Sequence, residues 1–271
     1  MRNPLDVIDA LHKKALLENS GVNPDALQLP LWPDDMRALP NDWARSALFS
    51  VRNKRIPRAA LKNAEVFHIH KQVKITFTGI ELRAEDDELV WQQIIDYAKP
   101  RPLGGLVEFS YYQLCKDLDW PINGRYYQKA EDCLSRLQAT AIKITTQRIG
   151  TLSLSMIDKF AVVEPGAAKA RCQVQIDPRM IYLFAGSHFA QIEWSHYRGL
   201  SPISRRLYDY IASHRAPYPI KLEIFRRLCG SDSARSAKWA EQVRNACAEI
   251  ETAGLVRKAW VEADSICCER Y

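Results

Sequence analysis

The sequence of 271 residues predicts an α+β fold that contains two tandem units of one type. The first observation behind this prediction is an internal repeat, in which three segments from the middle of the chain recur near its end. The second is that each copy follows the order helix, short strand, short helix, polar turn, longer helix and β-hairpin, which is the order of a winged helix. The third is the chain length, which suits about two domains. The matching segments are Leu106–Phe109, Gln113–Cys115 and Leu137–Ile142 in the first copy and Ile220–Glu223, Arg227–Cys229 and Ile250–Leu255 in the second.

The elements of the first unit follow from apolar spacing and from residues that start or stop helices. Leu89, Trp91 and Ile94 recur at helical spacing, and Pro100 ends this first helix. Ser110 is a suitable N-cap for the second helix, and a polar turn precedes the third. The expected elements are a helix over Asp87–Lys99, a strand at Leu106–Phe109, helices over Ser110–Leu118 and Arg125–Ala139, and a wing whose strands, Ala141–Arg148 and Thr151–Val163, flank Ile149–Gly150.

The second unit repeats this pattern after a further strand and helix. Pro217 and Pro219 end its first helix, and Gly254 is expected at the C-terminal end of its longest helix. The expected elements are a strand at Arg171–Ile176, a helical stretch at Asp177–Phe184, a helix over Ser201–His214, a strand at Ile220–Glu223, helices over Ile224–Leu228 and Ala234–Thr252, and a wing within Leu255–Cys268.

Three regions are expected along the chain. Residues 1–40 hold an amphipathic helix, which ends near residue 18, and then a flexible linker rich in Pro, Asp and Asn. Residues 41–165 form the first winged-helix domain, which also carries two strands of a small sheet at Val66–Ile69 and Val73–Phe77. Residues 166–271 form the second winged-helix domain.

Charge and cysteine content indicate the kind of partner and compartment. The net charge is only +6, but the stretch from Ser195 to Arg244 holds ten Lys and Arg residues against four acidic residues, which suits contacts with phosphates. Seven cysteines without a C-x-x-C pair predict neither a disulfide framework nor a zinc site, and they indicate a reducing cytoplasm. No apolar run approaches the ~20 residues that a membrane span needs.

The longest helix of each unit, here called its reading helix, is expected to enter the major groove of DNA. Arginine can bind guanine through two hydrogen bonds, and asparagine can bind adenine in the same way, whereas lysine mostly contacts phosphate. Some residues of such a helix would instead cap it or lie in solvent. The candidates for DNA contact are Asn123, Arg125, Tyr126, Lys129 and Arg136 in the first unit, Ser231, Ser233, Arg235, Lys238 and Arg244 in the second, and Arg52, Lys54 and Arg55 in a basic stretch before the first unit.

A DNA-nicking enzyme is one alternative interpretation. His68 and His70 have the His-x-His form of a metal site on a strand, and Tyr126–Lys129 has the Tyr-x-x-Lys form that carries the nucleophile in such enzymes. Short patterns of this kind often occur by chance, and here the tyrosines fall on the expected reading helix. The sequence also lacks a G-x-x-x-x-G-K-[ST] phosphate loop. We therefore expect no catalytic residues, no metal and no cofactor.

The segment Gln28–Trp32 is a candidate partner-binding peptide. Its sequence, Gln-Leu-Pro-Leu-Trp, is similar to the Gln-Leu-x-Leu-Phe peptide that docks in the hydrophobic cleft of the bacterial replicative sliding clamp. Gln28 would supply hydrogen bonds and Leu31 and Trp32 would fill apolar pockets, with Leu29 completing the peptide. The alternative is that the segment packs onto its own domain.

From about residue 40 to the C-terminus, the chain resembles the TrfA-type replication initiators of broad-host-range plasmids. This resemblance implies binding to tandem repeats (iterons) in a plasmid origin through two winged helices. The segments that carry the resemblance are Ala44–Phe49, Asp86–Gln93, Ile122–Tyr127, Cys133–Thr140, Leu183–Gly186 and Cys229–Ser233.

The same resemblance implies how replication would start. Such initiators help to melt an adjacent A·T-rich element, whose single strands they could also bind, and they bring in the host initiator, the replicative helicase and the sliding clamp. They start theta replication without nicking and interconvert between active monomers and inactive dimers. The residues themselves leave a transcriptional repressor with the same two DNA-binding units as an alternative.

Overall fold

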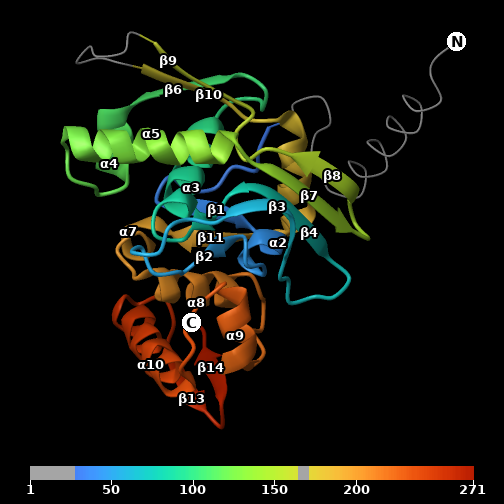
Figure 1. Cartoon of the computed structure of the whole chain (residues 1–271), viewed down its shortest axis with the longest axis vertical. Coiled ribbons are helices and arrows are strands. Elements are labelled where there is room, and N and C mark those ends of the chain that lie inside the picture. The colour runs from blue at the N-terminus through green and yellow to red at the C-terminus, as the bar shows by residue number, and fades with distance from the viewer. Residues whose placement is uncertain (1–27, 164–170) are drawn as a thin grey trace, which may run out of the picture.

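A computed structural model describes residues 28–163 and 171–271, which form a mixed α+β structure (Figure 1). The amphipathic helix expected before residue 18 and the loop expected at 164–169 lie outside these residues. In Figure 1 the C-terminal unit forms the lower end of the molecule, below the first unit and a four-stranded sheet.

The first unit has a three-stranded antiparallel sheet and three helices. The strand that opens it, β6, pairs with β10, and β10 pairs with β9. The elements of this unit are α3 (Asp87–Ala98), β6 (Leu106–Ser110), α4 (Tyr111–Asp117), α5 (Gly124–Gln138), β9 (Lys159–Val163) and β10 (Arg171–Gln175).

The second unit repeats this order and this pairing. Its first strand again pairs with its last, so the sheet order is β12-β14-β13. The elements are α8 (Pro202–Ala212), β12 (Ile220–Lys221), α9 (Leu222–Leu228), α10 (Ser236–Thr252), β13 (Lys258–Glu262) and β14 (Ser265–Glu269). The three helices, and the short strand between the first two of them, are therefore present in both copies as the repeat predicts.

Local signals in the sequence fix several helix ends. The Ser110 side chain accepts a hydrogen bond from the Gln113 amide at 3.1 Å, as expected for the N-cap of α4. Asn123 caps α5 in the same way, through the Tyr126 amide at 3.2 Å. Gly254 follows α10 with a φ of +70°, a backbone conformation that glycine adopts without a steric penalty.

The predicted wing of the first unit is wrong. Strands β7 (Ala141–Thr146) and β8 (Gly150–Leu154) do form a hairpin, but β7 pairs with β4 (Lys74–Ile80) and not with β6. The hairpin that completes the first unit is β9–β10. Two hairpins, β7–β8 and β9–β10, follow one another in the chain. The turn at Ile149–Gly150 predicts only the first of them.

The four-stranded sheet has the order β3-β4-β7-β8 and covers the core with one face. Its inward residues include Ile75, Phe77, Ile142 and Ile144, which are all at most 2% exposed. The edge strand β3 spans Ala60–Val66, earlier in the chain than expected, because its exposed side chains are polar and hide the alternation that predicts a strand. Of the expected strand at Val66–Ile69, only Val66 lies in β3, and His68 forms an isolated antiparallel bridge with Ser46.

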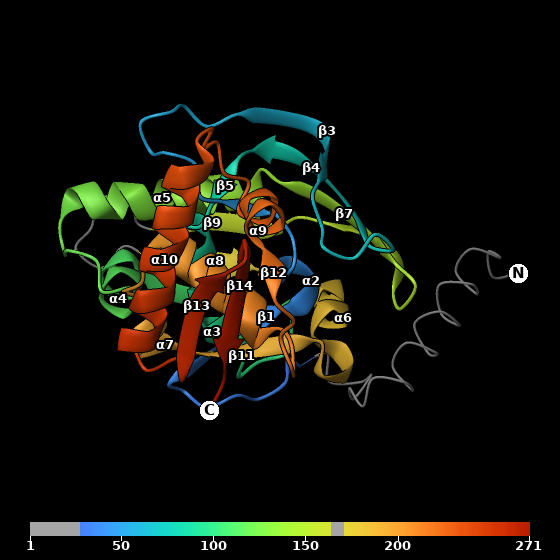
Figure 2. The same cartoon turned by 90° about the horizontal axis from the view of Figure 1, so that it is seen from below.

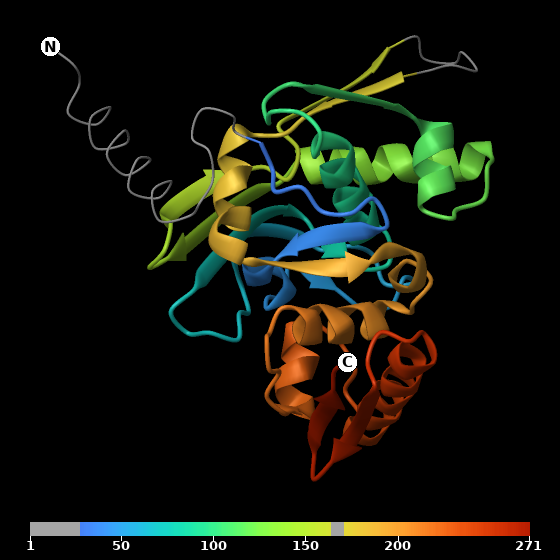
Figure 3. The same ribbon diagram turned by 180° about the vertical axis from the view of Figure 1, so that it is seen from behind.

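The expected boundary between domains at 165/166 is also corrected. It falls between β9 and β10, which pair with each other, so the strand at 171–175 belongs to the first unit. In addition, β1 (Met36–Pro40) pairs with β11 (Phe189–Glu193), and Figure 3 shows these two strands side by side in the middle of the molecule. The described part of the expected linker is therefore packed structure.

Short elements complete the region between the units. Trp43 of α2 packs on Trp91 of α3, with ring centroids 4.4 Å apart, and both side chains are fully buried. These elements are α2 (Asn41–Ala44), β2 (Phe49–Ser50), β5 (Leu82–Arg83), two 3₁₀ turns at Pro178–Met180 and Ala185–Ser187, α6 (Ile181–Phe184) and α7 (Trp194–Tyr197).

Candidate nucleic-acid interface

The N-terminal end of the first reading helix, α5, presents a polar and aromatic surface. Arg125 is exposed, whereas Asn123 is engaged as the N-cap of α5. The Lys129 ammonium lies 4.2 Å from the centroid of the Trp120 ring and 5.7 Å from that of Tyr126. These cation–π contacts hold Lys129 and Tyr126 together beside Arg125.

Arg136 faces the interior, which corrects its predicted DNA contact. Its guanidinium lies 2.9 Å from Asp87 Oδ1 and 3.5 Å from Asp86 Oδ2, and its side chain is 17% exposed. Arg58 binds the same two carboxylates, Asp86 at 2.7 Å and Asp87 at 2.6 Å. The guanidinium of Arg136 therefore fixes α5 to the start of α3.

In this cluster of two arginines and two aspartates, the pKa values of the two carboxyl groups shift in opposite directions. Burial, and then the neighbouring Asp86 carboxylate, raises the pKa of Asp87 to about 6. Burial acts in the same direction on Asp86, but the Arg58 guanidinium outweighs it and lowers the pKa of Asp86. The Cys133 thiol lies close to both carboxylates, yet two guanidinium groups already neutralise them, so the arrangement serves as an ion-pair cluster.

The second reading helix, α10, presents three exposed basic side chains. Arg235 is at its N-terminal end, and Lys238 and Arg244 follow along the helix. The two predicted serines hold the turn before the helix. Ser231 Oγ accepts a hydrogen bond from the Ser233 amide at 3.3 Å, and Arg226 donates to the Ser233 carbonyl at 2.9 Å.

The basic stretch lies beside the second unit, although it precedes the first unit in sequence. The Val51 amide donates to the Cys229 carbonyl at 2.8 Å, which fixes the start of the loop 51–59 to the turn before α10. Gly230 in that turn has a φ of +53°, and a Cβ at this position would lie 3.2 Å from Ser50 Cβ. Glycine therefore permits both the turn and the close approach.

The exposed side chains of Arg52, Lys54 and Arg55 extend the basic surface of the second reading helix. Figure 2 shows the loop between β2 and β3 and the N-terminal end of α10 together at the top, with α5 at the upper left. α10 runs down from this end, in the same left-hand half of the view as α5.

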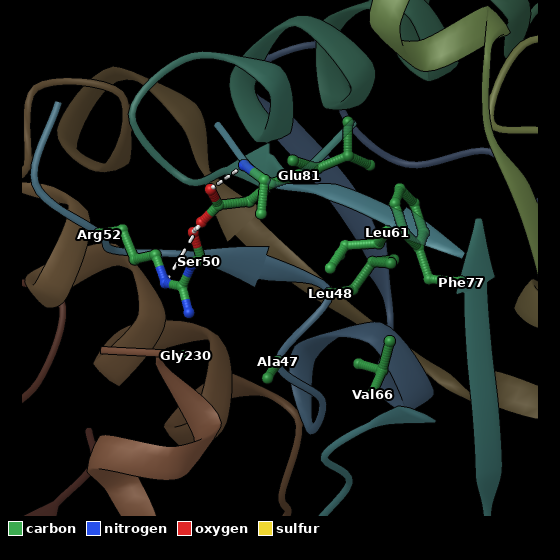
Figure 4. Close-up of a pocket in the computed structure, with 11 residues that line it drawn as sticks. Ala47, Leu48, Ser50, Arg52, Leu61, Val66, Phe77, Glu81 and Gly230 are labelled. Atoms are coloured by element: carbon green, nitrogen blue, oxygen red, sulfur yellow. Dashed lines mark hydrogen bonds and ion pairs between the residues drawn. The ribbon is translucent and has the colours of Figure 1, made fainter. Parts of the chain in front are cut away.

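A pocket of about 130 Å³ opens where this loop meets the second unit (Figure 4). Arg52 and Gly230 line its mouth, and its walls are apolar side chains such as Leu48 and Phe77. Arg52 Nε is 3.7 Å from Glu81 Oε1, and the Ser50 hydroxyl donates to the same carboxylate. The contacts of Glu81 with Arg52 and Ser50 orient the start of the loop 51–59.

The histidines of the nicking interpretation do not form the expected site. His68 is buried, and it lies with His70 in the segment that connects β3 and β4. Burial lowers the pKa of both side chains. Within residues 28–163 and 171–271, no group of three His, Cys, Asp or Glu side chains placed to hold a metal includes either histidine.

The candidate clamp peptide is largely packed onto its own domain. Leu29 and Trp32 are 2% and 4% exposed, whereas Leu31 is 73% exposed. Trp32 Nε1 donates to Asp96 Oδ1 at 3.0 Å, and its ring stacks on Phe184 with centroids 6.2 Å apart. In this conformation only part of the peptide is available to a partner.

Comparison with known proteins identifies the family. A family model described as TrfA protein matches residues 9–270. The chain belongs to the TrfA family. It is 55% identical over 262 residues to the plasmid replication initiator protein TrfA of Escherichia coli, and the alignment covers 94% of this chain and 69% of that relative.

The TrfA-family chain also shares its fold with a solved structure. Domains 2 and 3 of RctB superpose with a TM-score of 0.54 at 11% sequence identity, covering 86% of this chain and 99% of the RctB chain. None of the helices in the described ranges is long and apolar enough to cross a membrane.

Two features of this TrfA-family surface were not predicted. Trp120 supports Lys129, and the loop 51–59 contacts the second unit through Val51 as well as the first unit through Arg58. Trp120, an aromatic residue in the polar turn before α5, could have predicted the contact with Lys129. The contact of the loop with the second unit depends on a hydrogen bond between distant segments, which residue patterns do not encode.

Proposed function

We propose that this chain initiates plasmid replication by binding repeated sequences at its origin through two winged helices. The observation that carries the proposal is the repeated order of helices and strands, in which each reading helix exposes arginine at its N-terminal end. The family relationship to a plasmid replication initiator supports the biological setting.

In this proposal, α5 and α10 enter successive major grooves on one face of the duplex. Arg125 and Arg235 contact bases, while Lys129 and Lys238 contact bases or phosphates at the rim. The loop with Arg52, Lys54 and Arg55 contacts phosphates beside α10. Ser231 and Ser233 contribute by holding the turn that presents the second reading helix.

Binding energy, rather than a covalent step, would drive the opening of the A·T-rich element beside the repeats. Contacts with the separated strands and with the host initiator and helicase would then keep the origin open. The active species would be a monomer in equilibrium with an inactive dimer.

Contact with the sliding clamp would require a rearrangement of the peptide Gln28–Trp32. Gln28 and Leu31 are accessible enough to start such a contact, but Trp32 would have to leave its place against Phe184. We propose that clamp binding and this packing compete for the same side chains.

Footprinting of the purified chain on its own plasmid tests the proposal. The expected result is a periodic array of protected repeats next to an A·T-rich tract. Protection of a single operator over a promoter, without such an array, would instead support repression of transcription and contradict origin binding.

A further inference from the structure

The first helices of the two units meet at one buried ion-pair network. Arg206 of α8 donates from Nη1 to Glu88 Oε1 of α3 and to Asp209 Oδ2 of α8, both at 2.8 Å. The side chains of all three residues are 0% exposed. A charged side chain of the second unit is thus enclosed by the first.

Arg206 also holds a third segment. Its Nη2 donates to the carbonyl oxygens of Ser46 at 2.7 Å and Ala44 at 3.1 Å, at the C-terminal end of α2. The planar guanidinium therefore bridges α3, α8 and α2 with a geometry that an ammonium group could not reproduce.

Each first helix is in turn fixed to its own reading helix. Asp87 of α3, which directly precedes Glu88, binds Arg136 of α5. On the other side, Glu249 of α10 accepts hydrogen bonds from the Ser201 amide at 2.7 Å and from the Ser204 hydroxyl, at the start of α8. A continuous set of polar contacts therefore runs from α5 through α3 and α8 to α10.

The charges of the network favour a role in geometry over one in stability. Burial, and then the Glu88 carboxylate, raises the pKa of Asp209 well above its usual range. Buried ion pairs of this kind contribute little net stability, because desolvation offsets the attraction, but they can select one arrangement of the parts that they join.

We propose that Arg206 is a positioning residue that sets the distance and helical phase between the two stretches of duplex read by α5 and α10. This inference rests on the proposed function, because it requires both reading helices to engage one site. Major grooves on one face of the duplex recur about every 10.5 base pairs. Two reading helices in a fixed relation therefore cannot both follow an insertion of half a turn.

The test compares binding to a footprinted natural site with binding to the same site carrying five extra base pairs between its halves. Fluorescence anisotropy at one salt concentration gives the ratio of the two dissociation constants. We expect about a hundredfold weaker binding of the wild-type chain to the extended site, because one reading helix loses its base contacts.

The variant for this test replaces the whole network with neutral side chains of similar size: Arg206→Met, Glu88→Gln and Asp209→Asn. Without the network the two units are less firmly held relative to each other. Binding to the natural site should weaken about tenfold, since the second reading helix to bind is then less well placed for its half of the site. The ratio between the two sites should fall to tenfold or less. Val243→Ala, a buried change within α10, is the matched control and should keep the wild-type ratio.

Arg206→Lys provides a second variant if the neutral network does not fold. It keeps the charge but cannot span both carboxylates and the α2 carbonyls, so a partial fall in the ratio is expected. A folded network variant with the wild-type ratio would overturn the positioning role. Loss of specific binding by the wild-type chain itself would overturn the proposed function instead, so the two failures are distinguishable.

Discussion

Arg125 and Arg136 lie on the same reading helix but in opposite environments. Arg125 is exposed at the N-terminal end of α5, whereas Arg136 is paired with Asp87 at 2.9 Å. Arg125→Ala should therefore weaken specific DNA binding by about tenfold or more, through the loss of a base contact, without changing stability. Arg136→Ala should lower the free energy of unfolding by roughly 3 kcal/mol, because it removes one of the two guanidinium groups that neutralise the buried carboxylates of Asp86 and Asp87.

Urea denaturation and DNA titrations on both variants separate these effects. Equal losses of affinity, with no difference in stability, would contradict the interior role of Arg136. The Lys129 ammonium is held against the Trp120 ring, and Lys129 is only partly exposed.

His68 is expected to make the fold sensitive to acid. Burial lowers its pKa, so below about pH 6.5 the unfolded chain binds a proton that the folded chain does not. The contribution of His68 to the free energy of unfolding is thus fully present above pH 6.5 and is lost as the pH falls. His68→Asn should flatten the dependence of stability on pH between 6.5 and 5. Identical slopes for wild type and His68→Asn would refute this.

At the scale of elements, the loop 51–59 should act with the second unit as a phosphate contact. Changing Arg52, Lys54 and Arg55 together to alanine should weaken specific and non-specific binding alike. It should also reduce the slope of log K against log salt by up to about 3, since each phosphate contact contributes ~0.9. Lys71, Lys74 and Lys143, equally exposed in the region of the four-stranded sheet, provide a control of the same charge. The same fall in slope for the control would show an effect of net charge alone.

The segment 28–32 makes a second prediction at this scale. Trp32→Ala should lower the free energy of unfolding by about 3 kcal/mol, because its buried ring packs on Phe184. Leu31→Ala should leave stability within ~0.5 kcal/mol of wild type. Thermal or urea unfolding measures both. If neither substitution affects stability, the segment is the free linker that its composition suggests.

At the scale of the whole molecule, the sequence predicts the repeat better than the packing between its copies. Apolar spacing, Ser110 and Gly254 predict the helices of both units because these signals are local. The pairing of β1 with β11 and of β6 with β10 depends on contacts between distant segments, which residue patterns do not predict.

The sequence predicts the exposed basic residues of the candidate site but not the buried roles of Arg136 and Arg206. Arg125, Arg235 and Lys238 are predicted as donors on the expected reading helices, and the structure places all three on the surface. The sequence does not reveal that Arg136 pairs with Asp87, because arginine on an amphipathic helix is usually solvated. Arg206 was counted only as part of a basic stretch, although it is completely buried.

The central claim is that two non-equivalent reading helices bind the two halves of one site. Hydroxyl-radical and methylation-interference footprints of wild type, Arg125→Ala and Arg235→Ala on a single repeat test it most directly. The account predicts that Arg125→Ala loses contacts in one half of the site and Arg235→Ala in the other, with the halves about one helical turn apart. Loss of the same bases in both variants would contradict it.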